Sequence, residues 1–357
     1  MWIRDHEPEI YANTYKMLLA KDYIICRLTG EFVTDYSEAS GTDAFDLHKM
    51  EWSGEILKAA EIDQEKMPEL HASVDVIGKL TEDAAKALGL TQETKVVCGG
   101  GDGPCSALGA GSFQNGQHFL SFGTSAWIAG TSDRVFLDKE KTLICFGHVI
   151  TGKYMPCGTM QAAGSSYSYI RRALCKEEEK MAKEKGQSVY EVLNQLVMES
   201  PAGARGLVFL PYLLGERSPR WNPDTSGSFL GIKMEHEKCD YVRAVLEGVA
   251  MNLDIILTAH RENVSINELV LTGGGAKGDV VAQILADVLE LPLYRLDHVE
   301  SATSIAAATI AGVGVGVFDD FSVVDQFVKR EKVFEPNSEN REIYIKQKEL
   351  FEMGYQC

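Results

Sequence analysis

The chain has 357 residues, 45% hydrophobic and 24% charged, which is an ordinary folded composition and enough length for two domains with a cleft between them. The formal net charge of −17 excludes a nucleic-acid partner, because binding a phosphate backbone requires a cationic face and no lysine or arginine cluster provides one. The polar start and the lack of a long apolar run predict a cytoplasmic protein with no membrane partner.

The first third of the chain alternates helical patterns with short loops. Apolar side chains recur at helical spacing over residues 10–27 and, more weakly, 53–65, and Thr81 is placed to cap a helix over residues 81–88. A short buried strand at residues 95–98 follows, and it runs into the turn Gly99-Gly100-Gly101-Asp102-Gly103. Small residues from Cys105 to Ala110 then suit a helix packed closely against another backbone.

The pattern changes to strands after a domain boundary that we place at residues 113–117. Strands are predicted at residues 118–121, 126–131, 142–149 and 154–157. One long helical stretch over residues 166–196, interrupted at Gly186, carries a run of charges that indicates a solvated face.

The last third contains another strand and turn between helices. We expect helices at residues 240–260, 279–290 and 301–313, the last built from small side chains, and a strand at 268–272 before the turn Gly273-Gly274-Gly275. The charged tail from residue 331 is predicted to be a surface helix.

The eight cysteines and eight histidines give no sign of a metal site. There is no Cys-x-x-Cys pair, and no histidine or cysteine spacing matches a zinc site. Cys26, Cys98 and Cys145 lie inside apolar runs and are expected to be small buried side chains. No metal-ligating residue is therefore predicted.

Asp102 is the one carboxylate at the centre of a glycine turn. Directly after a buried strand it can project into a cleft and act as a general base in phosphoryl transfer. It can equally cap the helix that follows, and the spacing does not decide between these roles.

The turns at residues 121–125 and 273–277 can bind anions through main-chain amides. No Gly-Lys pair is followed by Ser or Thr, so a Walker loop is absent, and Gly123-Thr124-Ser125 offers amides and hydroxyls instead. A plain hairpin explains that segment equally well. The later turn fits Gly273-x-Gly275-x-x-Gly278, which taken alone also permits an NAD enzyme.

The irregular, aromatic and proline-containing segment at residues 209–231 has two interpretations of equal weight. Loops of this kind often carry function. The alternative is an ordered loop whose Trp221 packs on its own domain.

Taken in order, these segments resemble the FGGY family of carbohydrate kinases, within the actin-like ATPase superfamily, and most closely its xylulose kinases. The matching stretches cover nearly the whole chain and are far more specific than one glycine loop: residues 2–9, 21–23, 27–42, 99–111, 121–125, 209–231, 243–250 and 273–289. They displace the NAD interpretation.

The resemblance implies an α/β chain with the actin-like ATPase (ribonuclease H-like) fold. Residues 1–113 would be the later part of the sugar-binding domain, residues 114–340 a complete ATP-binding domain, and residues 341–357 a C-terminal helix or tail. The implied reaction transfers phosphate from ATP, with Mg²⁺, to a ketopentose, giving D-xylulose 5-phosphate and ADP.

The family's functional residues match positions in this sequence. Asp102 matches the base that deprotonates the attacking sugar hydroxyl. The other matches are Gly123 and Thr124 for the phosphate-binding hairpin, Gly164, Gly274, Gly275 and Ala276 for the nucleotide pocket, Asp279 for an adenine contact, and Gly103 and Trp127 for the sugar.

Two departures keep other functions open. Xylulose kinases commonly have Asn where Gly103 stands, which allows another sugar or polyol as substrate. The family's Asp-x-Gly-Thr turn, which precedes the stretch matched by residues 2–9, does not occur before it here, so we expect the chain alone to turn over poorly. A non-catalytic nucleotide-binding module, a split kinase completed by a separate N-terminal chain and a homodimer are the alternatives.

Overall fold

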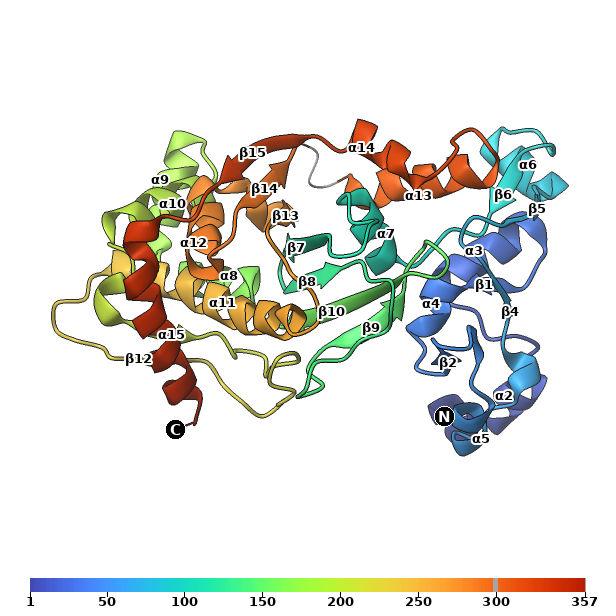
Figure 1. Cartoon of the computed structure of the whole chain (residues 1–357), viewed down its shortest axis with the longest axis horizontal. Helices are drawn as coiled ribbons and strands as arrows, with labels where there is room; N and C mark the ends of the chain where they lie inside the picture. The colour runs from blue at the N-terminus through green and yellow to red at the C-terminus, as the bar shows by residue number, and fades with distance from the viewer. Residues whose placement is uncertain (298–300, 357) are drawn as a thin grey trace.

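The computed structural model describes residues 1–297 and 301–356 and has two lobes joined by a pair of helices (Figure 1). The larger lobe contains a seven-stranded sheet with helices against it. The smaller lobe contains short helices and two-stranded sheets. The α/β class expected from the sequence is confirmed.

The smaller lobe is built from α1 (Trp2–His6), α2 (Pro8–Asn13), α3 (Ala20–Thr29), β1 (Val33–Asp35), α4 (Tyr36–Ser40), β2 (Phe45–Asp46), β3 (Glu51–Trp52), α5 (Gly54–Ala59), β4 (Glu69–His71), β5 (Val76–Lys79), α6 (Glu82–Leu88) and β6 (Lys95–Val97). The helix predicted at residues 81–88 is confirmed, and its cap Thr81 accepts a hydrogen bond from the Ala84 amide. The helix predicted over residues 10–27 is wrong at residues 14–19, because the Met17 amide donates to the Lys66 carbonyl instead of to a helical partner. The helix predicted over residues 53–65 shortens to α5.

The large sheet has the strand order β15-β14-β13-β7-β8-β10-β9. Its strands are β7 (His118–Phe122), β8 (Ala126–Gly130), β9 (Ile144–Gly147), β10 (Tyr154–Met160), β13 (Leu269–Thr272), β14 (Leu293–Leu296) and β15 (Arg330–Phe334). β13 is parallel to both β7 and β14, so the turns after β7 and β13 meet at one edge of the sheet. The surface helix predicted from residue 331 is wrong at its start, because β15 pairs antiparallel with β14 before α15 (Arg341–Gln356) begins.

Helices α8 (Gly164–Leu174), α9 (Lys176–Lys185), α10 (Val189–Glu199), α11 (Lys238–Arg261) and α12 (Asp279–Leu289), with the short strands β11 (Val208–Leu210) and β12 (Ser228–Leu230), complete this lobe. The helical stretch predicted over residues 166–196, with an interruption at Gly186, is three helices rather than two. They are separated at Cys175 and at Gly186, whose positive φ of 63° ends α9, and Ser188 then caps α10. The largest apolar core lies between the sheet and α11 and α12.

Two helices join the lobes: α7 (Asp102–Gly109) and α13 (Ala302–Gly314), with the short α14 (Val324–Phe327) beside α13 (Figure 1). Close packing by small residues is confirmed, because a Cβ added to Gly109 would overlap the Ala302 carbonyl group. Leu108, Ala306 and Ile310 share a buried apolar cluster across this contact.

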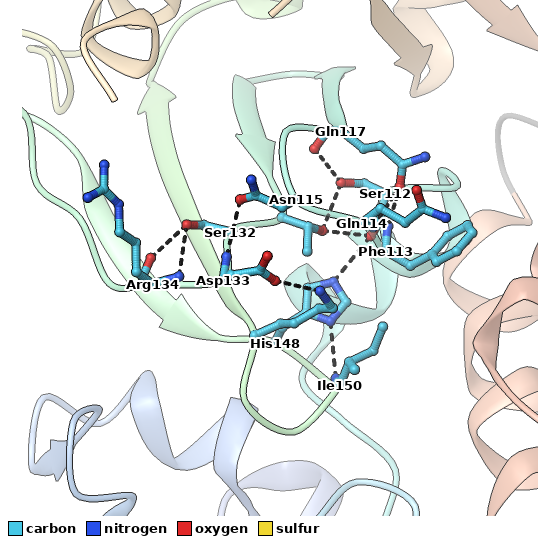
Figure 2. Close-up of polar contacts among 12 residues, drawn as sticks. Ser112, Phe113, Gln114, Asn115, Gln117, Ser132, Asp133, Arg134, His148 and Ile150 are labelled. Carbon is cyan, nitrogen blue, oxygen red and sulfur yellow. Dashed lines mark hydrogen bonds and ion pairs between the residues drawn. The ribbon is translucent and has the colours of Figure 1, made fainter. Parts of the chain in front are cut away.

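The segment between α7 and β7, where we expect a domain boundary, is tied to the loops of the large sheet (Figure 2). The Ser112 hydroxyl donates to the Gln117 carbonyl at 2.7 Å, and the Ser112 carbonyl lies 3.2 Å from Nε2 of buried His148. The Ile150 amide donates to the other ring nitrogen of His148, so Nε2 carries the proton. The start of β7 is therefore fixed relative to α7.

Of the seven cysteines that the structure describes, five are buried and Cys26 and Cys145 are half-buried. Cys357 lies outside the described residues. Within residues 1–297 and 301–356, no helix has the length and apolar character needed to cross a membrane.

Candidate active site

A cavity of about 560 Å³ opens where the turns after β7 and β13 approach the start of α8. We call it the glycine-turn cavity. It is lined by Phe122, Gly123, Thr124, Gly164, Tyr167, Ser168, Ser188, Tyr190, Glu191, Asn194, Gly274, Gly275, Lys277, Gly278 and Val281. Five of the seven residues expected to form a nucleotide pocket are therefore brought together.

The hairpin after β7 is held by the start of α8. The Gly164 amide donates to the Gly123 carbonyl at 3.0 Å, and the Ala163 and Ser165 amides donate to the Thr124 carbonyl. A Cβ on Gly164 would lie 2.4 Å from the Gly123 oxygen, so only glycine permits this approach. The carbonyls of the hairpin are thus occupied by protein donors.

The turn after β13 packs against the end of β7. Gly273 has a φ of 88°, and a Cβ there would lie 2.6 Å from the Phe122 oxygen. Gly274 has nothing within 4 Å of such a Cβ, so its open side is available to a ligand. Ala276 lies between Gly275 and Lys277 in the short 3₁₀ turn η3 (Gly274–Lys277).

The opposite wall consists of side chains from α8 and α10. The Tyr167 hydroxyl donates to Asn194 Oδ1 at 3.1 Å, and the Ser168 and Tyr190 hydroxyls lie 2.9 Å apart. Burial raises the pKa of Tyr167, which keeps its hydroxyl protonated as a donor. The sequence patterns identified none of these residues, although Tyr190 and Asn194 have the i, i+4 spacing of one helix face.

Asp279, expected to contact adenine, is the exposed first residue of α12 and is absent from the described lining of this cavity. Its carboxylate forms ion pairs with Lys332 at 2.6 Å and Arg295 at 2.8 Å. The hydrogen bond from Lys332, together with Arg295, holds the pKa of Asp279 below its usual value. Asp279 is therefore at the rim, directly after Gly278.

Asp102 is the exposed first residue of α7 and is also absent from the described lining of the glycine-turn cavity. Its Oδ1 accepts only the amide of the adjacent Gly103 among the hydrogen bonds of the described residues. It does not cap the helix in the usual position, which Gly101 occupies. Among residues 1–297 and 301–356, no cation forms an ion pair with this carboxylate at the surface of α7.

Glu38 of α4 lies beside the turn that precedes Asp102. A Cβ on Gly101 would lie 2.8 Å from Glu38 Oε2. Burial raises the pKa of Glu38, and Asp102 is one of the neighbouring negative charges that add to this effect. The carboxyl groups of Glu38, in α4, and Asp102, at the start of α7, are therefore close enough to influence each other.

Gly103 and Trp127, the expected sugar positions, are both close to one apolar cluster. A Cβ on Gly103 would lie 3.5 Å from the Met155 methyl carbon, and half-buried Trp127 packs against the cluster that contains Met155. The Trp127 ring also contacts Phe119 edge-to-face at 4.8 Å. Gly103, directly after Asp102, and Trp127 thus both approach the cluster formed on β8 and β10.

The loop at residues 209–231 contacts the segment that precedes α8. Buried Glu216 accepts hydrogen bonds from the Gln161 amide at 2.7 Å and from Asn252 at 2.9 Å. Trp221, in contrast, is 49% exposed and donates to the Thr142 carbonyl. Glu216 therefore ties the loop to Gln161, three residues before the start of α8.

Two family models match this chain, one after the other along the sequence. Residues 1–109 match the N-terminal domain of the FGGY family of carbohydrate kinases, and residues 125–315 match the C-terminal domain of that family. The chain belongs to the FGGY family of carbohydrate kinases. It is a sugar kinase with the fold of that family.

Curated relatives of this FGGY kinase have two different names. A xylulose kinase of Staphylococcus epidermidis is 34% identical over 99% of this chain and 70% of its own length. A gluconokinase of Bacillus licheniformis is 32% identical over 98% of this chain and 68% of its own length. The chain thus spans about 70% of the length of such relatives.

Two solved structures have a backbone fold that closely resembles that of this chain. A ligand-bound xylulose kinase from Lactobacillus acidophilus superimposes with a TM-score of 0.91 at 29% identity, covering 99% of this chain and 70% of that one. A gluconate kinase from the same organism gives the same TM-score, identity and coverage. The FGGY kinase fold is therefore shown.

Proposed function

We propose that this FGGY kinase transfers the γ-phosphoryl group of ATP to a ketopentose hydroxyl, converting D-xylulose and ATP to D-xylulose 5-phosphate and ADP. The observation that carries the proposal is the glycine-turn cavity, where backbone approaches that only glycine allows surround a space of about 560 Å³. That volume is within the range of small-molecule and cofactor sites. The xylulose kinase relatives support the choice of sugar.

In this proposal the cavity holds ATP. Gly123, Thr124 and Gly164 border the phosphates, and Gly274, Gly275 and Ala276 border the nucleotide on the other side, with Asp279 at the rim. Tyr167 and Asn194 contribute the polar and aromatic wall. ATP supplies the phosphoryl group.

The acceptor sugar lies against Gly103 and Trp127, and Asp102 takes the proton from the attacking hydroxyl. An exposed carboxylate without a cationic partner among the described residues suits a base that must reach a substrate. Mg²⁺ would be carried mainly by the phosphates, as is usual in kinase sites.

We also propose that residues 1–113 form the sugar-side domain, residues 114–340 the ATP-side domain and residues 341–357 a C-terminal helix. The tethered segment at residues 112–117 supports this boundary. The contact of α7 with α13 supports an arrangement in which Asp102 lies between the two sides.

The gluconokinase relatives favour D-gluconate as a second candidate substrate. The test uses the full chain with MgATP and measures ADP release with D-xylulose, D-gluconate or glycerol, beside calorimetry with ATP alone. Highest ADP release with D-xylulose supports the proposal, and highest release with D-gluconate replaces the sugar. ATP binding without sugar-dependent ADP release would instead favour a nucleotide-binding module, and absence of both would overturn the assignment of the cavity.

A further inference from the structure

The turn that carries Asp102 is connected through hydrogen bonds to a buried carboxylate that no sequence pattern identified. Asp35, at the end of β1, is fully buried. Its Oδ2 accepts hydrogen bonds from the Ser37 amide at 3.0 Å, from the Ser37 hydroxyl, and from the Ser73 hydroxyl at 2.8 Å. Its Oδ1 lies 3.1 Å from Lys21 Nζ.

The groups collected by Asp35 each contact the turn. Ser37 Oγ accepts a hydrogen bond from the Gly101 amide at 2.9 Å, and the Ser73 carbonyl accepts one from the Gly99 amide at 2.9 Å. Lys21 Nζ lies 3.4 Å from the Cys98 carbonyl and donates to it. Three of the four residues before Asp102, namely Cys98, Gly99 and Gly101, thus form hydrogen bonds with the residues that surround Asp35.

The hydroxyl of Ser37 is directional. A serine hydroxyl has one proton and two lone pairs. Because Asp35 takes the proton, the oxygen presents a lone pair to the Gly101 amide. The buried Gly101 amide therefore depends on the charge of Asp35 for a well-oriented acceptor.

The turn also has no room to move toward these residues. A Cβ on Gly100 would lie 2.4 Å from Val149 and 3.1 Å from Ser37 Oγ. Asp102 begins α7 immediately afterwards. A shift of the Gly101 amide would consequently be transmitted to Asp102.

We propose that Asp35 and Ser37 are positioning residues for Asp102: through the Gly101 amide they fix the backbone that determines where this carboxylate meets the acceptor hydroxyl. The inference rests on the proposed function. Neither residue contacts the substrate, and Lys21 balances the buried charge of Asp35.

The structure provides a matched control for the ion pair. Asp22 is as buried as Asp35 and contacts the same Lys21 Nζ at 2.9 Å. Its other oxygen accepts the Leu19 amide at the start of α3, away from the turn. Asp22→Asn therefore removes an equally buried charge without touching the Asp102 turn.

The test compares Ser37→Ala, Ser37→Thr, Asp35→Asn and Asp22→Asn in the full chain. Because a misplacement of about 1 Å can cost roughly 100-fold in rate, we expect Ser37→Ala and Asp35→Asn to lower kcat about 100-fold, with KM for ATP changed less than about twofold. Ser37→Thr retains a hydroxyl and should recover most of the rate, and Asp22→Asn should retain it. Deuterium exchange should be faster over residues 99–103 in Ser37→Ala and Asp35→Asn only.

The outcomes separate this inference from the proposed function. Full kcat in Ser37→Ala, or an equal loss in Asp22→Asn, would overturn the inference while leaving the kinase assignment intact. A wild-type chain with no sugar-dependent ADP release would overturn the proposed function itself. Exchange over residues 99–103 would then still show whether Ser37 orders the turn. If Asp35→Asn does not fold, Ser37→Ala and its threonine counterpart decide the question.

Discussion

At the scale of single residues, the site depends on one carboxylate and a few glycines whose surroundings exclude a side chain. Asp102 is exposed, whereas Gly164 and Gly273, beside the cavity, are crowded by backbone. The carboxylate can therefore be changed without disturbing the packing, but the glycines cannot. The two kinds of substitution should have different signatures.

Asp102→Asn should lower the rate of sugar-dependent ADP release by roughly 10²- to 10⁴-fold, because an amide cannot accept the hydroxyl proton. Binding of ATP by calorimetry should be unchanged, since Asp102 does not line the described cavity. Asp83→Asn, in the exposed first turn of α6, is the control and should keep full activity. Equal rates for the two variants would remove Asp102 from the proposed mechanism.

Gly164→Ala should weaken ATP binding, because the new methyl group would lie 2.4 Å from the Gly123 carbonyl oxygen and push the hairpin away from α8. Overpacking of this kind also costs about 1–3 kcal/mol of unfolding free energy. Calorimetry and urea unfolding measure the two effects. Gly54→Ala, whose methyl group would be 3.7 Å from Gln64, should affect neither, and unchanged ATP affinity in Gly164→Ala would contradict the assignment.

The residues predicted from sequence are those that lie within one turn. Gly123, Thr124, Gly274 and Gly275 follow buried strands, so a local pattern identified them, and the parallel pairing of β13 with β7 brings them together. Asn194 and Tyr167 meet only because α8 and α10 pack against each other, which no local pattern specifies. The same is true of Asp35 and Gly101, which are 66 positions apart in the sequence but are bridged by Ser37.

At the scale of elements, the pair α7 and α13 determines how Asp102 is presented. The run of small residues in α13 was sufficient to predict close helix packing, and Gly109 against Ala302 is the closest point of that contact. The strand β15 was missed because its charged side chains are exposed at the edge of the sheet, where alternation is weak. Short-range propensity therefore predicts interior elements better than edge elements.

Gly109→Ala should separate α7 from α13, because the added Cβ would overlap the Ala302 carbonyl group. The unfolding free energy should fall by about 1–3 kcal/mol or more, and ADP release should fall with it as Asp102 shifts. Ser106→Ala is the comparison, since it adds no overlap and removes an exposed hydroxyl that donates to the Asp102 carbonyl at 2.8 Å and lies 3.0 Å from the Thr303 hydroxyl, so it should cost only about 1 kcal/mol. Urea denaturation of both variants measures the difference, and equal stabilities would contradict the packing argument.

At the scale of the whole molecule, the large lobe buries several titratable groups that the unfolded chain exposes. Burial lowers the pKa of His118 and of His148 to about 4 and lowers that of His260 well below its usual value, so all three are neutral in the folded protein at neutral pH. Burial raises the pKa of Glu216 to about 7. The stability of the lobe must therefore depend on pH, with contributions of opposite sign.

The sign for the histidines follows from proton uptake. Below about pH 6.5 the histidines of the unfolded chain bind protons, whereas His118 and His148 in the folded protein stay neutral down to about pH 4. The stability that these neutral histidines contribute is therefore complete above pH 6.5 and is lost as the pH falls from 6.5 to about 4. Each histidine contributes a slope of up to about 1.4 kcal/mol per pH unit. Glu216 opposes this between pH 4.5 and about 7, where the folded state binds the extra proton, and Glu38, Glu247 and Asp254, whose pKa values burial also raises, act in the same direction.

We therefore expect the unfolding free energy at pH 7.5 minus that at pH 5.5 to be smaller in His148→Gln than in the wild-type chain. Glutamine can still donate to the Ser112 carbonyl and accept from the Ile150 amide, but it does not titrate. His48→Gln, at an exposed site, should leave the difference unchanged. Urea unfolding at the two pH values measures this, and an unchanged pH dependence in His148→Gln would mean that His148 does not resist protonation in the folded lobe. Protonation at Nδ1 would remove the acceptor of the Ile150 amide, whereas Nε2 would still donate to the Ser112 carbonyl (Figure 2).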